Sequence, residues 1–207
     1  MTVQVRDLVG TAEWSAAAAL YRLVFGYTDP VYGLSPRLLA ALHENAGSVI
    51  GAFDPAGDLV GFCFGFTAVD AGEIYHYSQA AVVHPDAQGT GVGRLLKQAQ
   101  AGTARATGAR TMRWTFDPYA VRNAHFNLAV LGATGIRFLP DYYGRGTDRI
   151  LVSWDLTGPP VRGPVTRTVA ASGRDQLRRQ LAGAFAAGGR LVGVDRDPVA
   201  YHFAEDA

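Results

Sequence analysis

A glycine-rich string at residues 83–96, VHPDAQGTGVGRLL, constrains the fold of this chain more than any other feature. It stands between an apolar run typical of a strand and a run with helical spacing. Glycines at 89, 91 and 93 permit positive φ angles and leave backbone N–H groups unobstructed. The helix that follows directs its positive end at the same loop, and Arg94 adds a cation, so the string predicts a pocket for phosphate oxygens. A glycine-rich connection that serves only close packing is the alternative.

Two common nucleotide-binding loops do not fit this spacing. The G-x-G-x-x-G loop of dinucleotide-binding folds, started at Gly89, requires glycine where this chain has Arg94. The phosphate loop of nucleoside triphosphatases requires a Gly-Lys pair, which the sequence does not contain. Both interpretations are therefore excluded.

The hydrophobic pattern around the loop predicts an α/β chain with a mixed sheet flanked by helices. Strands are expected at Val3–Arg6, Ser48–Phe53, Leu59–Val69, Ile74–Val83, Arg110–Phe116, Ile136–Leu139 and Arg149–Leu156. Helices are expected after a cap at Thr11, after Ser35-Pro36, over Val92–Thr103 with a stop at Gly108, and over Arg122–Leu131. Strand, glycine loop, helix and strand form a crossover unit, which makes the sheet mixed.

Side-chain orientation is predicted for two of these elements. In Ile74–Val83, alternation places the even-numbered residues, His76 and Ser78 among them, on one face and the odd-numbered residues on the other. In the helix over Arg122–Leu131, Phe126 and Val130 are expected to point inward.

A boundary is expected at Gly158-Pro159-Pro160, because paired prolines end a strand and stiffen a linker. Residues 1–157 would then form the main domain, and residues 158–207 an extension that packs on it. A helix in the extension is marked by Leu177, Leu181 and Phe185, and a hairpin by Arg190–Val194 with Val199–Phe203. This extension is also where a dimer contact or a lid is expected, and the oligomeric state stays open.

Composition narrows the class of protein. The 207 residues are 48% hydrophobic and 18% charged, which excludes disorder and a coiled coil. A net charge of +1 gives no electrostatic case for nucleic acid or an anionic membrane as partner. Cys63 is the only cysteine and Lys97 the only lysine, so neither a disulfide nor a zinc cluster built on cysteines is expected, and catalytic lysine chemistry would require Lys97 itself. With no signal peptide and no apolar run of about 18 residues, a cytoplasmic protein is expected.

The glycine string resembles the Q/R-x-x-G-x-G/A signature of the GNAT acetyltransferase superfamily, with Gln88–Gly93 in the six positions. The resemblance extends to the preceding Val83-His84-Pro85, to the following Leu95-Leu96, and to the order of elements over about three quarters of the chain. Several downstream strings resemble a subgroup of uncharacterised predicted acetyltransferases: Trp114–Pro118, Arg122–Asn127, Leu131–Ala133, Tyr142–Gly144 and Thr147–Arg149.

This resemblance implies that acetyl-CoA lies in a cleft where the strand ending at Val83 diverges from the strand starting at Arg110. Its pantetheine would bond backbone groups of Ala81, Val82 and Val83. Its pyrophosphate would be held by the N–H groups of Gln88, Gly89, Thr90, Gly91, Val92, Gly93 and Arg94. Asn123 and Phe126 are further candidates for cofactor binding, although aligning on Gly132 places the family's usual asparagine at Val121. No metal is implied.

The resemblance also implies direct attack by an amine, for which a general base is useful. His76 is the first candidate, because it lies on the strand leading into the signature and histidine titrates near neutrality. Glu73, at the start of that strand, is the second. A hydrogen-bonded core histidine and an exposed loop carboxylate are the respective alternatives.

The leaving thiolate is often protonated in this family by a tyrosine, and this chain departs from that pattern. Aligning Gly132-Ala133 with the family's Gly-Phe places Leu128 at the tyrosine position. Tyr142 and Tyr143 are substitutes by chain order, with capping of the core as the alternative. Asp117 and Arg122 are candidates for binding substrate, and an Asp-Pro turn and a solvated arginine would explain them equally.

The sequence therefore predicts an N-acetyltransferase that moves an acetyl group from acetyl-CoA to the amine of a small molecule. An acceptor at a peptide or protein N-terminus fits the same chemistry. A non-catalytic acyl-CoA-binding or sensing module is the alternative from a different class, favoured by the missing tyrosine.

Overall fold

Two units divide the chain in the computed structural model, Met1–Met112 and Arg113–Ala207. The structure describes residues 2–158, 163–170 and 173–205. Pro159 and Pro160, part of the boundary expected from the sequence, lie outside the described residues. The division into a domain over 1–157 and an extension over 158–207 stays a prediction.

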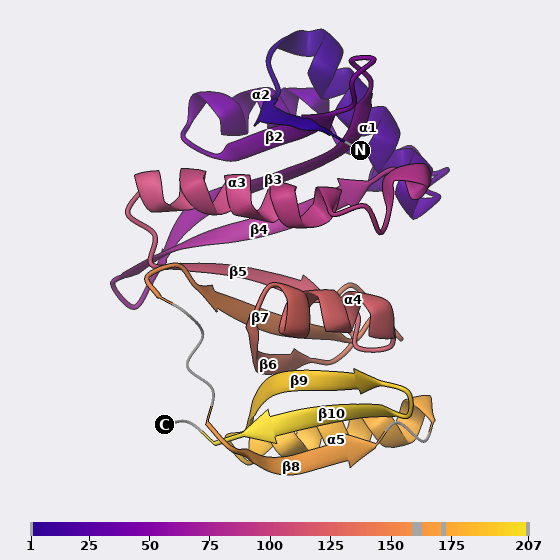
Figure 1. The fold of residues 1–207 in the computed structure, drawn as a ribbon, viewed down its shortest axis with the longest axis vertical. Coiled ribbons are helices and arrows are strands. Elements are labelled where there is room, and N and C mark those ends of the chain that lie inside the picture. Colours follow the sequence, from indigo (N-terminus) through magenta and orange to yellow (C-terminus); the bar gives the residue numbers. More distant parts are fainter. Residues whose placement is uncertain (1, 159–162, 171–172, 206–207) are drawn as a thin grey trace. The chain divides into compact units, whose positions relative to one another are not determined.

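The first unit is built on an antiparallel sheet whose strands follow chain order (Figure 1). Its strands are β1 (Gln4–Asp7), β2 (Ser48–Phe53), β3 (Leu59–Asp70) and β4 (Glu73–Val83). Its helices are α1 (Gly10–Phe25), α2 (Pro36–Glu44) and α3 (Val92–Ala106), with short 3-10 turns at Pro30–Tyr32 and Pro85–Ala87. Each strand and α-helix matches an expected one to within a few residues, whereas the two 3-10 turns were not predicted.

Helices cover both faces of this sheet, and β3 shows how. Phe62 and Phe64 belong to a buried cluster with Leu39 of α2 and Leu20 of α1, whereas Cys63 between them packs with Leu96 of α3. Alternate residues of a strand point to opposite faces. The centre of β3 is therefore buried on both sides.

A β-bulge on β4 overturns the predicted alternation of that strand. Ser78 pairs with Gly65 and Ala80 pairs with Phe64, so Gln79 is the extra residue. Before the bulge the even residue His76 faces α3, whereas after it the even residue Val82 packs with the α1–α2 cluster. The prediction that all even residues share one face is thus wrong, because one inserted residue reverses the pattern.

The second unit has its own set of strands, joined in the order β5-β7-β6-β9-β10-β8. They are β5 (Thr111–Phe116), which crosses the boundary between the units, β6 (Thr134–Leu139), β7 (Arg149–Asp155), β8 (Val165–Ala170), β9 (Arg190–Arg196) and β10 (Val199–Ala204). Its helices are α4 (Val121–His125), continued by a π-helical turn over Phe126–Val130, and α5 (Arg174–Ala186). The expected C-terminal helix and hairpin are confirmed, and α5 packs against β6 and β8.

Two local predictions are wrong, and one strand was not predicted. Thr11 lies inside α1 and Val9 occupies the cap position. Val130 is 41% exposed, because the π-helical turn adds a residue per turn and leaves Ala124, Asn127 and Leu128 as the buried positions. Strand β8 was not expected, since its alternating side chains are mostly exposed and its partner β10 lies far along the chain.

Candidate functional site

The glycine loop forms an open cradle at the start of α3. Gly89 and Gly91 have φ angles of 83° and 96°, and a side chain built at Gly91 would meet nothing within 4 Å. Arg94 and Leu95 donate their N–H groups to the carbonyl of Gly91, so the first turn of α3 begins at the loop itself. The preceding N–H groups of that turn have no intrahelical acceptor, and together with the helix dipole they favour an anion.

Two side chains brace this cradle from within the loop. Thr90 Oγ1 donates to the carbonyl of Ala87 at 2.7 Å, and Gln88 Nε2 donates to the carbonyl of Val83, the last residue of β4, at 3.2 Å. The loop is thus tied to the end of β4, where the exposed Ala81 and the half-buried Val83 flank the buried Val82. Gln88 acts here through a structural bond, which leaves the neighbouring backbone N–H groups for a ligand.

His76 is fully buried and lies in a chain of hydrogen bonds that joins α3 to the sheet. Its Nε2 is 2.8 Å from Ser48 Oγ, which also accepts from Gln100 Nε2 at 2.8 Å. Its Nδ1 is 3.2 Å from Thr67 Oγ1, which lies 2.8 Å from Thr107 Oγ1. Both ring nitrogens of His76 therefore have partners inside the unit.

The direction of each bond in this chain follows from its two ends. Thr107 donates to the carbonyl of Ala104, so it accepts from Thr67, and Thr67 in turn accepts from His76 Nδ1–H. At the other end Ser48 accepts from Gln100, so its hydroxyl donates to Nε2. Burial, with Lys97 nearby, lowers the pKa of His76 to about 4, in keeping with this neutral Nδ1–H form. These contacts favour a structural role for His76, and its assignment as general base stays a prediction.

Lys97 is buried on the same face of the sheet, with Nζ 2.7 Å from Ser78 Oγ. Burial lowers the pKa of Lys97 to about 7 and raises the pKa of Cys63 to about 12. Neither group is exposed to a substrate, and Glu73, the second candidate base, is the exposed first residue of β4. The part of the chain that the structure describes contains no cluster of three or more His, Cys, Asp or Glu side chains able to hold a metal ion.

A pocket of about 260 Å³ opens on the other face of the same sheet. Its walls come from α1, the segment 33–42, β3 and the bulge of β4, and consist of Tyr21, Gly33, Leu34, Leu38, Leu42, Phe64, Phe66 and Gln79. None of these side chains carries a formal charge. Gln79, the bulge residue of β4, lines this pocket and lies two positions before Ala81 in the same strand.

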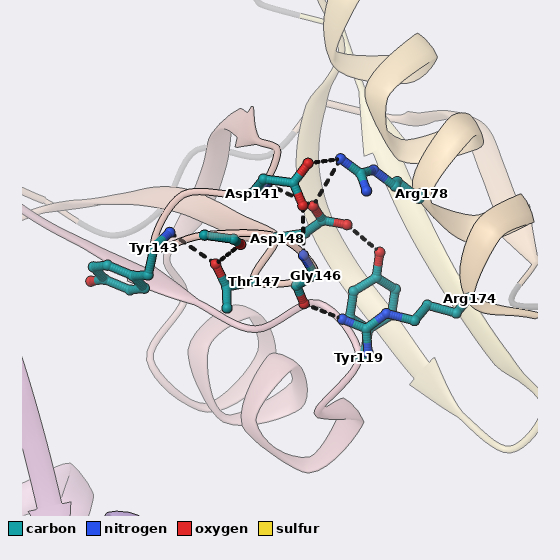
Figure 2. A network of polar contacts seen from close by, with 9 residues as sticks. Tyr119, Asp141, Tyr143, Gly146, Thr147, Asp148, Arg174 and Arg178 are labelled. Atoms are coloured by element: carbon teal, nitrogen blue, oxygen red, sulfur yellow. Dashed lines mark hydrogen bonds and ion pairs between the residues drawn. The ribbon is translucent and has the colours of Figure 1, made fainter. Parts of the chain in front are cut away.

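The second unit holds a charged network around the loop between β6 and β7 (Figure 2). Asp148, 2% exposed, accepts from the Tyr119 hydroxyl at 2.6 Å and from the N–H of Asp141 at 2.9 Å. Arg178 of α5 donates to Asp141 at 2.6 Å and lies 3.4 Å from Asp148. The bond to Arg178 holds the pKa of Asp141 below its usual value.

The remaining predicted site residues also lie in the second unit. Tyr142 and Tyr143 are 45% and 60% exposed, so capping of the core does not describe them. Asp117 accepts from the N–H of Tyr119 in a turn, and Arg122 and Asn123 are exposed on α4. The half-buried Phe126 begins the π-helical turn.

Sequence patterns did not single out the residues that organise these sites. Asn127, in the π-helical turn after α4, is the buried amide rather than Asn123. It accepts from Trp114 Nε1 at 2.8 Å and donates back to Asn123. The bulge at Gln79, the Ser48–Gln100 bond and the pair of Asp148 with Arg178 have no local signature, because each depends on residues distant in sequence.

A strand with a bulge at Gln79, a glycine loop and a helix N-terminus define an α/β protein that binds a phosphate-bearing cofactor. The model of the acetyltransferase (GNAT) family matches residues 14–132. The chain therefore belongs to the GNAT acetyltransferase family, and it is an acetyl-CoA-dependent N-acetyltransferase with the predicted mixed α/β fold. No curated protein sequence matches it significantly.

Solved structures share this fold at low sequence identity. The Salmonella typhimurium protein yncA, solved with acetyl-CoA, is 18% identical over 81% of this chain and 100% of its own, with a TM-score of 0.61. The Escherichia coli ribosomal-protein-S18-alanine N-acetyltransferase is 17% identical over 78% of this chain and 100% of its own, with a TM-score of 0.58. Aminoglycoside 6′-acetyltransferase type Ii is 18% identical over 77% of this chain and 100% of its own, with a TM-score of 0.58. No helix among the described residues is long and apolar enough to cross a membrane.

Proposed function

We propose that this protein transfers the acetyl group of acetyl-CoA to the amine of a small molecule by direct attack, without an acetylated enzyme. The observation that carries the proposal is the open cradle at Gly91, whose positive φ and open surroundings leave room for a ligand beside the backbone of the loop. The fold neighbour from Salmonella typhimurium binds acetyl-CoA, which supports the same cofactor here.

Positioning supplies most of the chemistry in this proposal. The N–H groups over Gly89–Gly93 hold the pyrophosphate, whereas the N–H of Arg94 is bonded to the carbonyl of Gly91. Backbone groups of Ala81–Val83 orient the pantetheine and polarise the thioester carbonyl. The bulge at Gln79 interrupts the ladder of β4 next to these residues, and a bulged residue leaves backbone groups unpaired. Backbone donors fixed in this way stabilise the oxyanion as the amine attacks.

The uncharged pocket beside Gln79 supports a small acceptor with an apolar part. Its 260 Å³ is close to the lower limit for small-molecule sites, and its walls are mostly leucine and phenylalanine. A polycation would need carboxylates there. The fold neighbours include enzymes for both kinds of acceptor, since their names specify an aminoglycoside and a ribosomal protein. A peptide N-terminus is therefore the competing acceptor, and an apolar first residue would fit the same pocket.

A matched pair of glycine substitutions tests the cofactor site. Gly91→Glu introduces a carboxylate and a side chain into the cradle, and acetyl-CoA affinity measured by calorimetry is expected to fall at least about tenfold. Gly57→Glu is the control: Gly57 has a φ of 91° and equally open surroundings, but lies in the β2–β3 turn. Both variants place a side chain at a positive φ. Equal affinity in the two variants would refute the proposed phosphate loop.

The acceptor class is tested by measuring CoA release with a panel of amines. The panel pairs arylalkylamines with aminosugars of comparable size, and adds short peptides with apolar or charged first residues. Turnover with the apolar small amines is expected, whereas turnover only with peptides would replace the small-molecule acceptor.

One observation favours a second function, a non-catalytic acyl-CoA sensor. Leu128, at the position of the family's usual tyrosine, is fully buried, so no acid is available there. Tight acetyl-CoA binding without turnover on the whole panel is the result that this alternative predicts.

A further inference from the structure

We propose that Gln79 determines which amines this protein accepts: its carboxamide binds the amine nitrogen of an arylalkylamine whose ring fills the pocket that Gln79 lines. This inference rests on the proposed function, and it names the residue and the class of acceptor that the pocket selects. Every residue that carries it belongs to the first unit.

The β-bulge of β4 turns Gln79 toward the pocket. Neighbouring residues of a regular strand point to opposite faces. Here Gln79 lines the pocket, while the next residue, Ala80, packs against the buried cluster on the same α1–α2 side. The inserted residue therefore adds one side chain to this face, two positions before Ala81. At about 3.3 Å per residue, Gln79 lies roughly 7 Å along β4 from the backbone that the proposed function assigns to the thioester.

Gln79 supplies a hydrogen-bonding group to an otherwise apolar pocket. Of the described side chains that line it, only Gln79 and Tyr21 carry polar atoms. Tyr21 has partners within the chain, and its ring contacts those of Phe25 and Tyr27, with centroid distances of 4.7 and 5.8 Å. The side chain of Gln79 is exposed and makes no hydrogen bond within the part of the chain that the structure describes. Its carboxamide oxygen can therefore accept a hydrogen bond from a ligand.

Three aromatic side chains give the pocket a preference for a ring. They are Tyr21 of α1 and Phe64 and Phe66 of β3. Each is braced by a second ring: Tyr21 by Phe25 at 4.7 Å, Phe64 by Phe62 at 6.2 Å, and Phe66 by Tyr77 at 5.6 Å. Walls held in this way keep their shape, and each aromatic contact adds about twofold to tenfold to the affinity of a bound ring. The volume of about 260 Å³ favours a single ring.

A carboxamide suits an amine that must lose a proton before it attacks. Its oxygen accepts from the protonated amine and also from the neutral one. A carboxylate would bind the ammonium group more tightly, but it would also favour that charged, unreactive form. None of the described side chains that line the pocket carries a formal charge. Gln79 therefore orients the amine without favouring its protonated form.

The first test compares Gln79→Leu with Gln98→Leu, in which an exposed glutamine of α3 is changed. The probe is 2-phenylethylamine, and ethylbenzene is the matched ligand without a hydrogen-bond donor. Binding of each is measured by NMR titration in the presence of CoA, which has no acetyl group to transfer. Gln79→Leu is expected to raise the Kd of 2-phenylethylamine at least about fivefold and to leave that of ethylbenzene within about twofold, because a charge-assisted bond is lost. Gln98→Leu is expected to change neither.

Two further variants separate the role of the amide from that of the rings. Gln79→Glu is expected to lower the Kd of 2-phenylethylamine about threefold and also to lower kcat, a combination that a damaged fold does not produce. Phe66→Ala is expected to raise the Kd of both ligands about threefold or more. Phe66 is 40% exposed, so its removal leaves the core intact, and Val69→Ala, at a position 69% exposed on the same strand, is the control.

Several outcomes would overturn the inference. They are an unchanged Kd of 2-phenylethylamine in Gln79→Leu, an equal loss for both ligands, or no effect of Phe66→Ala on either ligand. Turnover of 2-phenylethylamine that does not depend on Gln79 would support the acetyl transfer and refute the role of Gln79. Binding that depends on Gln79, with no CoA released from acetyl-CoA by the wild type, would instead refute the transfer and support the amine site.

Discussion

Two polar networks, one in each unit, hold a helix in place by opposite means. In the first unit a neutral chain through Ser48, His76 and Gln100 joins α3 to the sheet, and none of its members is more than 2% exposed. In the second unit Asp141 and Asp148 pair with Arg178, whose side chain is 36% exposed. The first network is a buried part of the core that holds α3, the helix that begins at the phosphate loop. The second is a clamp on a loop, with a buried Asp148 and a partly exposed Arg178.

The difference follows from what burial permits. A neutral hydrogen-bonded chain can be enclosed without a large desolvation cost, but each bond that it loses leaves a buried polar group unpaired, so its geometry admits little change. Ion pairs at the surface contribute little each and respond to salt, which suits a contact that fixes a loop. We therefore expect the first network to be weakened by substitutions that shift its atoms and by a change of pH. We expect the second to be weakened by salt and by removal of one charged side chain.

The largest effect is expected from Gly65→Ala in the first network. A Cβ there would lie 2.3 Å from the Tyr77 carbonyl and 2.8 Å from His76 Nε2, and the backbone oxygen cannot move without disturbing the bulge. The free energy of unfolding, measured in urea, should fall by about 3 kcal/mol or more. Gly102→Ala is the control in α3, where nothing lies within 4 Å, and it should stabilise by about 1 kcal/mol. If the free energy of unfolding falls by less than about 1 kcal/mol in Gly65→Ala, the hydrogen-bonded chain around His76 tolerates the shift that the new methyl group imposes.

The next largest effect is expected from His76→Gln. At pH 7 the free energy of unfolding of the variant should be about 2 kcal/mol lower, because the hydrogen-bonded chain loses a partner at Ser48 or at Thr67. The unfolded histidine binds a proton at a pKa near 6.5 and the folded one only near 4, so the unfolded state holds more protons between these values. Wild-type stability should therefore fall as pH drops from 6.5 to 4, by at most roughly 3 kcal/mol.

Comparing the wild type with His76→Gln also tests the role of His76 in the reaction. The stability gap between them should close by pH 4.5, as followed by urea unfolding at each pH. If His76 is only structural, the variant keeps its kcat at pH 8. A lower rate with loss of a limb near neutrality would instead identify His76 as the general base.

Much of the first unit was predictable because its elements carry local signals. Ser48–Phe53 was predicted residue for residue, and the Gly89–Gly93 string located the start of α3. The bulge was not predictable: Gln79 sits in a run that alternates without interruption, and only pairing with Phe64 and Gly65 shows the extra residue. Faces that depend on register are set by partners far along the chain.

The candidate site shows the same division. Chain order suggested Tyr142 and Tyr143, but nothing local indicated that Asp148 would be buried or that Arg178 would meet it. His76 was recognised as either a base or a core histidine, and its partners Ser48 and Thr67 come from other strands. Burial and long-range pairing, rather than residue type, decide such roles.

A smaller effect is expected from Lys97→Met. The folded lysine has a pKa of about 7 and the unfolded one near 10.5, so the unfolded state binds more protons between these values. Wild-type stability should rise from pH 7 to pH 9, and the variant should be nearly flat there, with a difference at pH 7 within about 1 kcal/mol. Cys63 and His76 are the other titratable groups coupled to this amine. Arg105→Met, which removes a cation from the exposed side of the same helix, should keep the slope. If the stability of Lys97→Met also rises from pH 7 to pH 9, the buried amine is not the source of this pH dependence.

The smallest effect is expected from salt on the second network. At 1 M NaCl the screening length is about 3 Å, comparable to the separations of Arg178 from Asp141 and Asp148, 2.6 and 3.4 Å. Screening of a partly exposed pair should weaken it by less than about 1 kcal/mol, so exchange at the Tyr143 and Thr147 amides should accelerate at most about fivefold. Amides around His76 should not respond, because no ion pair holds them. Arg178→Ala should remove the response of the loop, and an equal response in that variant would mean that the clamp is not electrostatic.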